Sequence, residues 1–133
     1  MHATYWCGIL AAWVSTGAFA RPHQGHCDAT SGQLTCAATS DSGRTLSLRF
    51  PTVSVTTDTA EAVFCSLPAG PLEKAELWMS MGDEGHGSGP TTLTPQGENC
   101  WAIGDIEFLM PGTWQIKLRF ADGDQGVVDV PVQ

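Results

Sequence analysis

The chain has 133 residues, enough for one domain, and its 14 acidic and 6 basic residues give a formal net charge of -8. This acidic balance argues against nucleic-acid binding, which needs a basic face, and equally against docking on an anionic membrane. The sequence has no phosphate-binding glycine loop and no G-x-S-x-G nucleophile elbow, and it locates no pair of carboxylates across a cleft. An enzyme is therefore the class with the least support.

Residues 1–20 predict an export signal. An apolar run from Tyr5 to Val14 is followed by small residues that end in Ala18-Phe19-Ala20, an A-x-A cleavage pattern. A short buried helix or an anchor is the alternative, but the run is too short and interrupted to span a bilayer comfortably. We therefore expect a mature chain that begins near Arg21, does not insert into the membrane and works in the periplasm or outside the cell.

Residues 21–44 are polar and rich in small side chains, which predicts an N-terminal arm ahead of a domain at residues 45–133. The arm contains RPHQGH, so His23 and His26 are additional candidate ligands for copper or zinc. Pro22 has no N–H, which blocks square-planar binding of Cu(II) through successive backbone amides. A polar arm with solvated histidines is the alternative.

Four cysteines follow the predicted signal, an even number, and three pairings of them are open. We favour a short loop closed by Cys27 and Cys36 and a long-range bridge between Cys65 and Cys100, because the second pair lies in strand-like sequence. Disulfides persist in the periplasm and the cell exterior. A four-cysteine zinc site is the alternative, but no C-x-x-C spacing supports it.

From Thr45 onward the sequence consists of short runs with a period of two, and no segment has a sustained helical period. Turn signals such as PAGP, GSGP and MPG separate the runs, and ADGDQG is the clearest hairpin signal. Two carboxylates in DGDQG resemble the start of a calcium loop, but its later acidic positions are absent. The pattern predicts an all-β, immunoglobulin-like antiparallel β-sandwich of about seven to eight short strands. Its strands are expected at residues 45–50, 60–67, 75–81, 113–120 and 126–132, with two further short strands within 98–109 on either side of a kink at Gly104.

The stretch WMSMGDEGHGSGP, residues 78–90, contains the candidate site. Met79 and Met81 lie two apart on a predicted strand and so share one face, and a glycine-rich loop can bring His86 back toward them. Thioethers are soft donors that select Cu(I), and imidazole is an acceptable third ligand. The alternative is that Leu77, Met79 and Met81 form the inward face of a strand, since methionine packs well in cores.

Two motifs make residues 77–132 resemble the FixH/YtkA-like family of exported or membrane-tethered bacterial domains. MSMGDEGHG is similar to that family's Met-Pro-x-Met-Gly-His-Gly region, and IEFLMPGTWQIKL is similar to its Phe-x-Met-Pro-Gly-x-Trp-x-Leu strand. The resemblance implies an immunoglobulin-like sandwich and a role in copper handling or in the assembly of copper-dependent respiratory enzymes. It places Met79, Met81 and His86 at the metal-site positions, and Met110-Pro111-Gly112 with Trp114 at the turn and core-strand positions.

The chain departs from the family pattern in two places. Ser80 stands where the family often has proline, and Asp83-Glu84-Gly85 separates Gly82 from the histidine. Met110 is a further candidate ligand, although its Pro-Gly neighbours favour a turn and a packing role.

Two functions follow as expectations. The first is an exported domain that binds Cu(I) and exchanges it with an exported donor or acceptor. The second is a disulfide-stabilised interaction module that binds another exported protein without metal.

Overall fold

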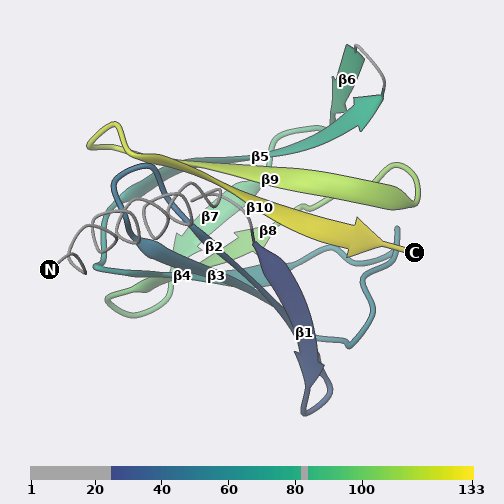
Figure 1. Cartoon of the computed structure of the whole chain (residues 1–133), viewed down its shortest axis with the longest axis horizontal. Coiled ribbons are helices and arrows are strands. Elements are labelled where there is room, and N and C mark those ends of the chain that lie inside the picture. The colour runs from purple at the N-terminus through teal and green to yellow at the C-terminus, as the bar shows by residue number, and fades with distance from the viewer. Residues whose placement is uncertain (1–24, 82–83) are drawn as a thin grey trace, which may run out of the picture.

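The computed structural model describes residues 25–81 and 84–133, and the predicted export signal and His23 lie outside them. The described residues form two antiparallel sheets that pack face to face (Figure 1). The strands are β1 (His26–Thr30), β2 (Gln33–Thr39), β3 (Thr45–Phe50), β4 (Ala62–Leu67), β5 (Leu72–Met81), β6 (Glu84–Gly87), β7 (Thr92–Pro95), β8 (Cys100–Gly104), β9 (Gly112–Phe120) and β10 (Gln125–Val132).

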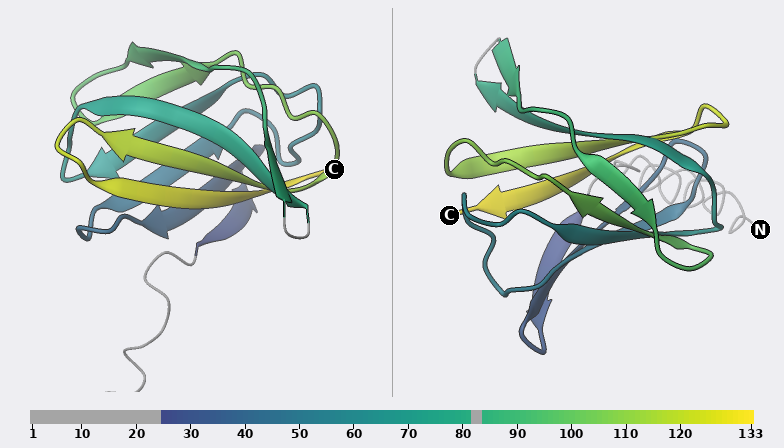
Figure 2. Two further views of the ribbon diagram at one scale, coloured as in Figure 1. Left: turned by 90° about the horizontal axis from the view of Figure 1, so that it is seen from above. Right: turned by 180° about the vertical axis from the view of Figure 1, so that it is seen from behind.

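One sheet has the strand order β1-β2-β3-β4-β8-β7, and the other has the order β10-β9-β5-β6. Figure 2 shows the two sheets as separate layers, with β1 and β6 projecting from opposite sides of the sandwich. The predicted all-β sandwich is confirmed. The described residues contain ten strands rather than seven or eight, because β1, β2, β6 and β7 add to the predicted set.

The core lies between the sheets and is built by strict alternation along the strands. In β3 every second side chain is buried, and the same pattern holds in β9. Aromatic rings pack against one another in this core. The ring centroids of Phe64 and Phe120 are 6.1 Å apart, and those of Phe108 and Trp114 are 5.5 Å apart. Full burial of one such side chain contributes about 1.5–3 kcal/mol to stability.

The N-terminal region differs from the polar arm predicted over residues 21–44. Residues 26–39 form the β1–β2 hairpin, and β2 is an interior strand of the larger sheet. Its inward side chains, Leu34, Cys36 and Ala38, are buried. Cys36 and Ala38 are small, and the outward positions are threonine and alanine, so the period of two is weak in the sequence. Strand β1 lies at the sheet edge and is mostly exposed, which agrees with its polar composition.

Of the two short strands predicted within residues 98–109, only the first is present. Only Cys100–Gly104 is a strand, and Asp105 has a positive φ of 56° that turns the chain out of the ladder. The following segment is irregular, yet Ile106 and Phe108 are buried, and the Ile106 N–H donates to the carbonyl of Ala60 at 3.0 Å. The apolar pattern there reflects core packing without strand pairing.

Both favoured disulfides are present. Cys27 and Cys36 are directly paired residues of the β1–β2 hairpin, and Cys65 and Cys100 are directly paired between β4 and β8. Two disulfides agree with an oxidising compartment outside the cytoplasm. No helix in residues 25–81 or 84–133 is long and apolar enough to cross a membrane.

A polar network joins two turns at one end of the sandwich. Asp124, in the β9–β10 turn, is buried, and its carboxylate accepts hydrogen bonds from Ser40 Oγ at 2.7 Å and from Ser42 Oγ at 2.6 Å. Arg44 donates to the same carboxylate at 2.9 Å and to Asp122 at 2.7 Å. The β9–β10 turn is therefore fixed to the turn between β2 and β3, some 80 residues earlier.

The protonation of Asp124 follows from these contacts. Burial alone raises the pKa of this carboxyl, but hydrogen bonds from Ser42, Ser40 and Arg44 outweigh burial and hold the pKa well below its usual value. The hydrogen bond to Asp122 raises the pKa of Arg44 in turn. The DGDQG turn thus uses its carboxylates for an internal salt bridge.

Candidate functional site

The candidate site lies where β5 separates from its neighbour β9, which itself continues to Gly112. Strand β5 pairs with β9 as far as Trp78, opposite Gln115, and it pairs with β6 from Trp78 to its end. Residues 78–81 and 84–87 therefore form a two-stranded ribbon that extends beyond the sandwich (Figure 1). Part of the segment that was predicted to be a glycine-rich loop is instead the short strand β6.

The register of this ribbon brings the predicted ligands together along the backbone. Met79 is the direct partner of His86, and Met81 is the direct partner of Glu84. The side chains of Met81 and His86 lie outside the described part of the structure. Two residues of the insertion, Glu84 and Gly85, are thus paired positions of β6.

Met79 faces inward at the end of the core. Its side chain is 9 % exposed, and it belongs to the hydrophobic cluster between the sheets. Its Cε occupies the position where a Cβ of Gly112 would be. Gly112 also has a φ of +140°, which an L side chain rarely adopts. The absence of a side chain at this glycine therefore makes room for the Met79 thioether.

The turn before β9 brings a second methionine to the same end. Met110 precedes Pro111 and Gly112, and it is 38 % exposed. Its carbonyl accepts a hydrogen bond from the Trp114 indole Nε1 at 2.8 Å, and Trp114 is fully buried. The predicted packing role of this motif belongs to its backbone and to Trp114, whereas the Met110 side chain is open to solvent.

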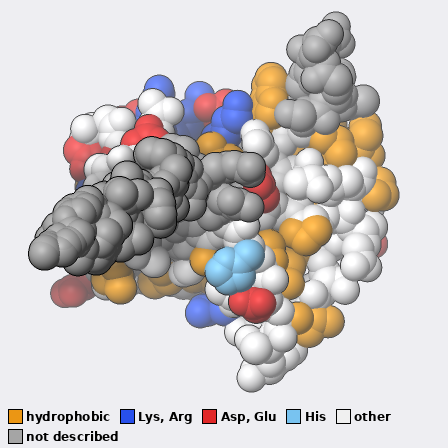
Figure 3. Space-filling view, in the orientation of Figure 1, with side chains coloured by type: hydrophobic (Ala, Val, Ile, Leu, Met, Phe, Trp, Pro, Cys, Tyr) orange, Lys and Arg blue, Asp and Glu red, His pale blue; other side chains and the backbone are white. Residues whose placement is uncertain are grey.

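His26 lies away from these residues. It is on β1, in the other sheet, and β1 and β6 project from opposite sides of the sandwich (Figure 2). Its Nε2 lies 3.3 Å from a carboxylate oxygen of Asp28, and both side chains are exposed. Figure 3 shows a histidine side chain beside an acidic one on the surface. His26 is therefore not a ligand of a site at the end of β5.

The donor set at the end of β5 is soft. All four cysteines of the described chain are in disulfides, so none offers a thiolate. Residues 25–81 and 84–133 contain no cluster of three His, Cys, Asp or Glu side chains that could hold a metal ion. Thioethers with one imidazole are a ligand set that suits Cu(I).

Two features of this end were not predicted from the sequence. Gly112 is needed for the packing of Met79, which only a structure shows. Lys117 places its ammonium 4.5 Å from the centre of the Trp78 ring on the outer face of the sheet. The alternation of TWQIKLRF puts Lys117 outward, but the sequence alone does not show which strand lies beside it.

Replacing Gly112 by alanine is expected to destabilise the protein by about 2–3 kcal/mol, through backbone strain and through overlap with Met79. Gly123 is a matched control. It also has a positive φ, of 94°, but a Cβ there would meet nothing within 4 Å, so Gly123→Ala should cost about 1 kcal/mol. Urea denaturation of both variants measures the difference. In a Met79→Ala background the overlap is removed, so Gly112→Ala should cost less there than in wild type. An equal cost in both backgrounds would refute the contact between Met79 and Gly112.

Comparison of the chain with known protein families, with curated proteins and with solved structures found no match in any of the three. The chemistry of the site is therefore considered on its own.

Proposed function

We propose that this protein is an exported copper-handling domain that holds Cu(I) between Met79 and Met81 of β5 and His86 of β6. The observation that carries the proposal is the register of the hairpin, which pairs Met79 directly with His86. Directly paired residues in an antiparallel ladder have their Cβ atoms about 4.5–5.5 Å apart and share a face. Met81, two residues along the strand, belongs to the same face.

The surroundings of Met79 support a soft ion. Its thioether is nearly enclosed between the sheets, so a bound ion would be partly shielded from water and from harder oxygen ligands. The side chain of Met110 is exposed next to Gly112, where it offers a further sulfur at the rim. The rest of the sandwich is a rigid scaffold, which limits how far the ligands can move apart.

A specific observation also supports the second function, an interaction module. Leu109 is 56 % exposed and Met110 is 38 % exposed, and they are adjacent on the turn that contacts Met79. Together they give a small apolar surface that a partner protein could cover. In the copper function the same residues would dock the exported protein that gives or takes the ion, and in the alternative they dock a partner without metal.

The pH dependence of Cu(I) binding tests the proposed ligand set. Thioethers do not titrate, and an ordinary imidazole takes up a proton near pH 6.5. The affinity should therefore be constant above that pH and fall about tenfold per pH unit below it, the slope for one proton. A His86→Asn variant should bind more weakly, with no slope in this range. A slope of two or more protons, or identical profiles for the two proteins, would contradict the ligand set.

A further inference from the structure

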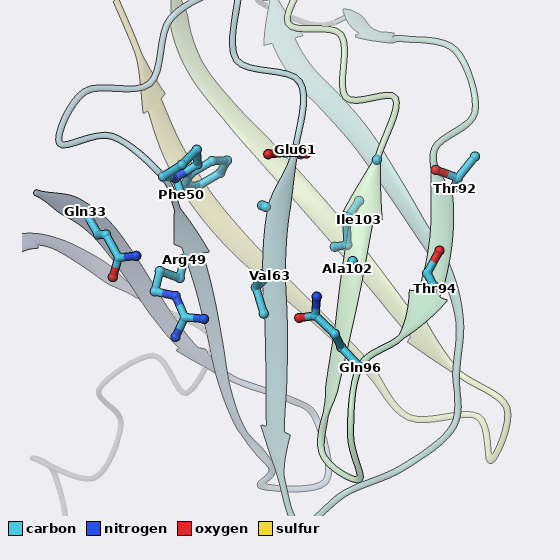
Figure 4. Close-up of a pocket in the computed structure, with 13 residues that line it drawn as sticks. Gln33, Arg49, Phe50, Glu61, Val63, Thr92, Thr94, Gln96, Ala102 and Ile103 are labelled. Carbon is cyan, nitrogen blue, oxygen red and sulfur yellow. The ribbon is translucent and has the colours of Figure 1, made fainter.

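The outer face of the six-stranded sheet carries a groove that lies apart from the candidate copper site. It has a volume of about 280 Å³ and is formed over strands β2, β3, β4, β8 and β7. Figure 4 shows Gln33 and Arg49 along one side, Thr92 and Thr94 along the other, and Gln96 reaching in between. Its size is at the lower limit for small-molecule sites, which suits one sugar-sized ligand.

The register explains why the face is hollow. Arg49 is paired with Val63, Val63 with Ala102, and Ala102 with Thr94, so the four residues form one row across four strands. Arg49 and Thr94 stand at the ends of the row, while Val63 and Ala102 are short, half-buried and apolar between them. With strands about 4.8 Å apart, the ends of this row are roughly 14 Å apart at the backbone. The result is a trough with an apolar floor and polar walls.

Arg49 differs from the other basic residues of the described chain. Arg44, Lys74 and Arg119 each have a carboxylate partner, and Lys117 lies over the Trp78 ring. The Arg49 side chain is exposed and makes no hydrogen bond or ion pair within residues 25–81 and 84–133. In a protein with a net charge of -8, a cation without a partner at the wall of a groove is available to a ligand.

We propose that this groove binds the carboxylate of an acidic sugar, a uronate. The Arg49 guanidinium has the planar pair of donors that matches a carboxylate in a two-point contact. The amides of Gln33 and Gln96 and the hydroxyls of Thr92 and Thr94 can each donate and accept, as sugar hydroxyls require.

The remaining lining residues set the orientation of the ligand. The floor of Val63 and Ala102 can pack against the C–H face of a sugar ring. Glu61 lies at another part of the groove and also has no ion-pair partner in the described chain (Figure 4). It repels a carboxylate but accepts hydrogen bonds from hydroxyls, so the ligand carboxylate must turn toward Arg49.

The test is a ¹H–¹⁵N NMR titration of the disulfide-bonded protein with D-glucuronate, with D-glucose and acetate as separate probes. Saturable shifts are expected at the amides of Arg49, Val63 and Ala102 with D-glucuronate. D-Glucose lacks the carboxylate and acetate lacks the hydroxyls, so each should bind at least about tenfold more weakly, the equivalent of one charge-assisted or two neutral hydrogen bonds.

Variants of the basic residues complete the test. Arg49→Gln should weaken D-glucuronate binding at least about tenfold. Arg49→Lys keeps the charge without the two-point contact, so its affinity for D-glucuronate should lie between those of Arg49→Gln and wild type. Arg119→Gln, which removes an exposed arginine from the opposite sheet, should change it less than twofold. Unshifted spectra away from the groove will show that each variant is folded. The proposal is overturned if the groove amides do not shift, if Arg49→Gln binds as wild type does, or if D-glucose or acetate binds as tightly as D-glucuronate.

Discussion

Replacing Asp124 by alanine is expected to lower the free energy of unfolding by about 3 kcal/mol, because the substitution leaves buried donors without an acceptor. The carboxylate accepts from two serine hydroxyls, from the Ser42 amide and from Arg44, and its side chain is only 4 % exposed. Arg44 keeps its partner Asp122, so the loss should stay at the lower end for a broken buried ion pair. Chemical denaturation of the disulfide-bonded protein measures it.

The pH dependence gives a second test of this network. Because the pKa of Asp124 is lower in the folded protein than in the unfolded chain, its contribution to stability is complete above the ordinary aspartate value near 3.9. The contribution decreases as the pH falls below that value toward the folded pKa. The difference in stability between wild type and Asp124→Ala should therefore be constant at neutral pH and shrink in acid. Asp129→Ala, at an exposed position of β10, should cost less than about 0.5 kcal/mol, and an equal cost for both variants would contradict the role of the network.

Replacing Trp114 by alanine is expected to cost about 3–5 kcal/mol, the range for removing a large aromatic side chain from a core. Trp114 is fully buried, it packs against Phe108 at 5.5 Å, and its indole N–H donates to the carbonyl of Met110. The substitution opens a cavity and also frees the turn that contacts Met79. Thermal and urea unfolding measure the loss of stability.

Trp114→Phe separates these two contributions. Phenylalanine keeps most of the packing but cannot donate a hydrogen bond to the carbonyl of Met110. That carbonyl belongs to a turn residue whose side chain is exposed. We expect a cost of about 1–2 kcal/mol, from one lost hydrogen bond and a small loss of volume. If Trp114→Phe were as damaging as Trp114→Ala, the indole hydrogen bond rather than packing would dominate at this position.

Strands with large alternating side chains were the part of the fold that the sequence predicted best. The strand expected at residues 45–50 is confirmed as β3, and TWQIKLRF lies within β9. The hairpin at ADGDQG is confirmed as well, because its turn residues allow a tight reversal between two alternating runs. Both disulfides were predicted, Cys65–Cys100 from its place in strand-like sequence and Cys27–Cys36 as the closure of a short loop.

Other features depend on contacts between distant residues, which local patterns do not contain. Strand β2 buries small side chains, so its alternation is too weak to distinguish it from a polar arm. Segment 105–109 has the apolar spacing of a strand, but the positive φ of Asp105 directs it away from any partner. The hydrogen bonds of Asp124 come from residues about 80 positions earlier, and only the turn itself was visible in the sequence.

The candidate site was also predicted from the sequence only in part. The alternative to a metal site was that Leu77, Met79 and Met81 form the inward face of a strand, and Leu77 and Met79 are indeed buried. It did not predict that His86 would lie in a paired strand opposite Met79, because the glycines around it favour a loop. The sequence could not exclude His26 as a ligand of this site. The structure excludes it, because His26 lies in the other sheet. Copper binding by Met79, Met81 and His86 stays a prediction.

The most direct test is a Cu(I) competition titration of the disulfide-bonded protein, with a Met79→Leu/Met81→Leu double variant measured beside it. Leucine has a similar volume and should keep the packing of the strand while removing both thioethers. The account predicts that wild type binds one Cu(I) per chain, and that the equally folded double variant loses this binding. Absence of Cu(I) binding by folded wild type, or equal binding by both proteins, would contradict it and leave the interaction module as the function to pursue.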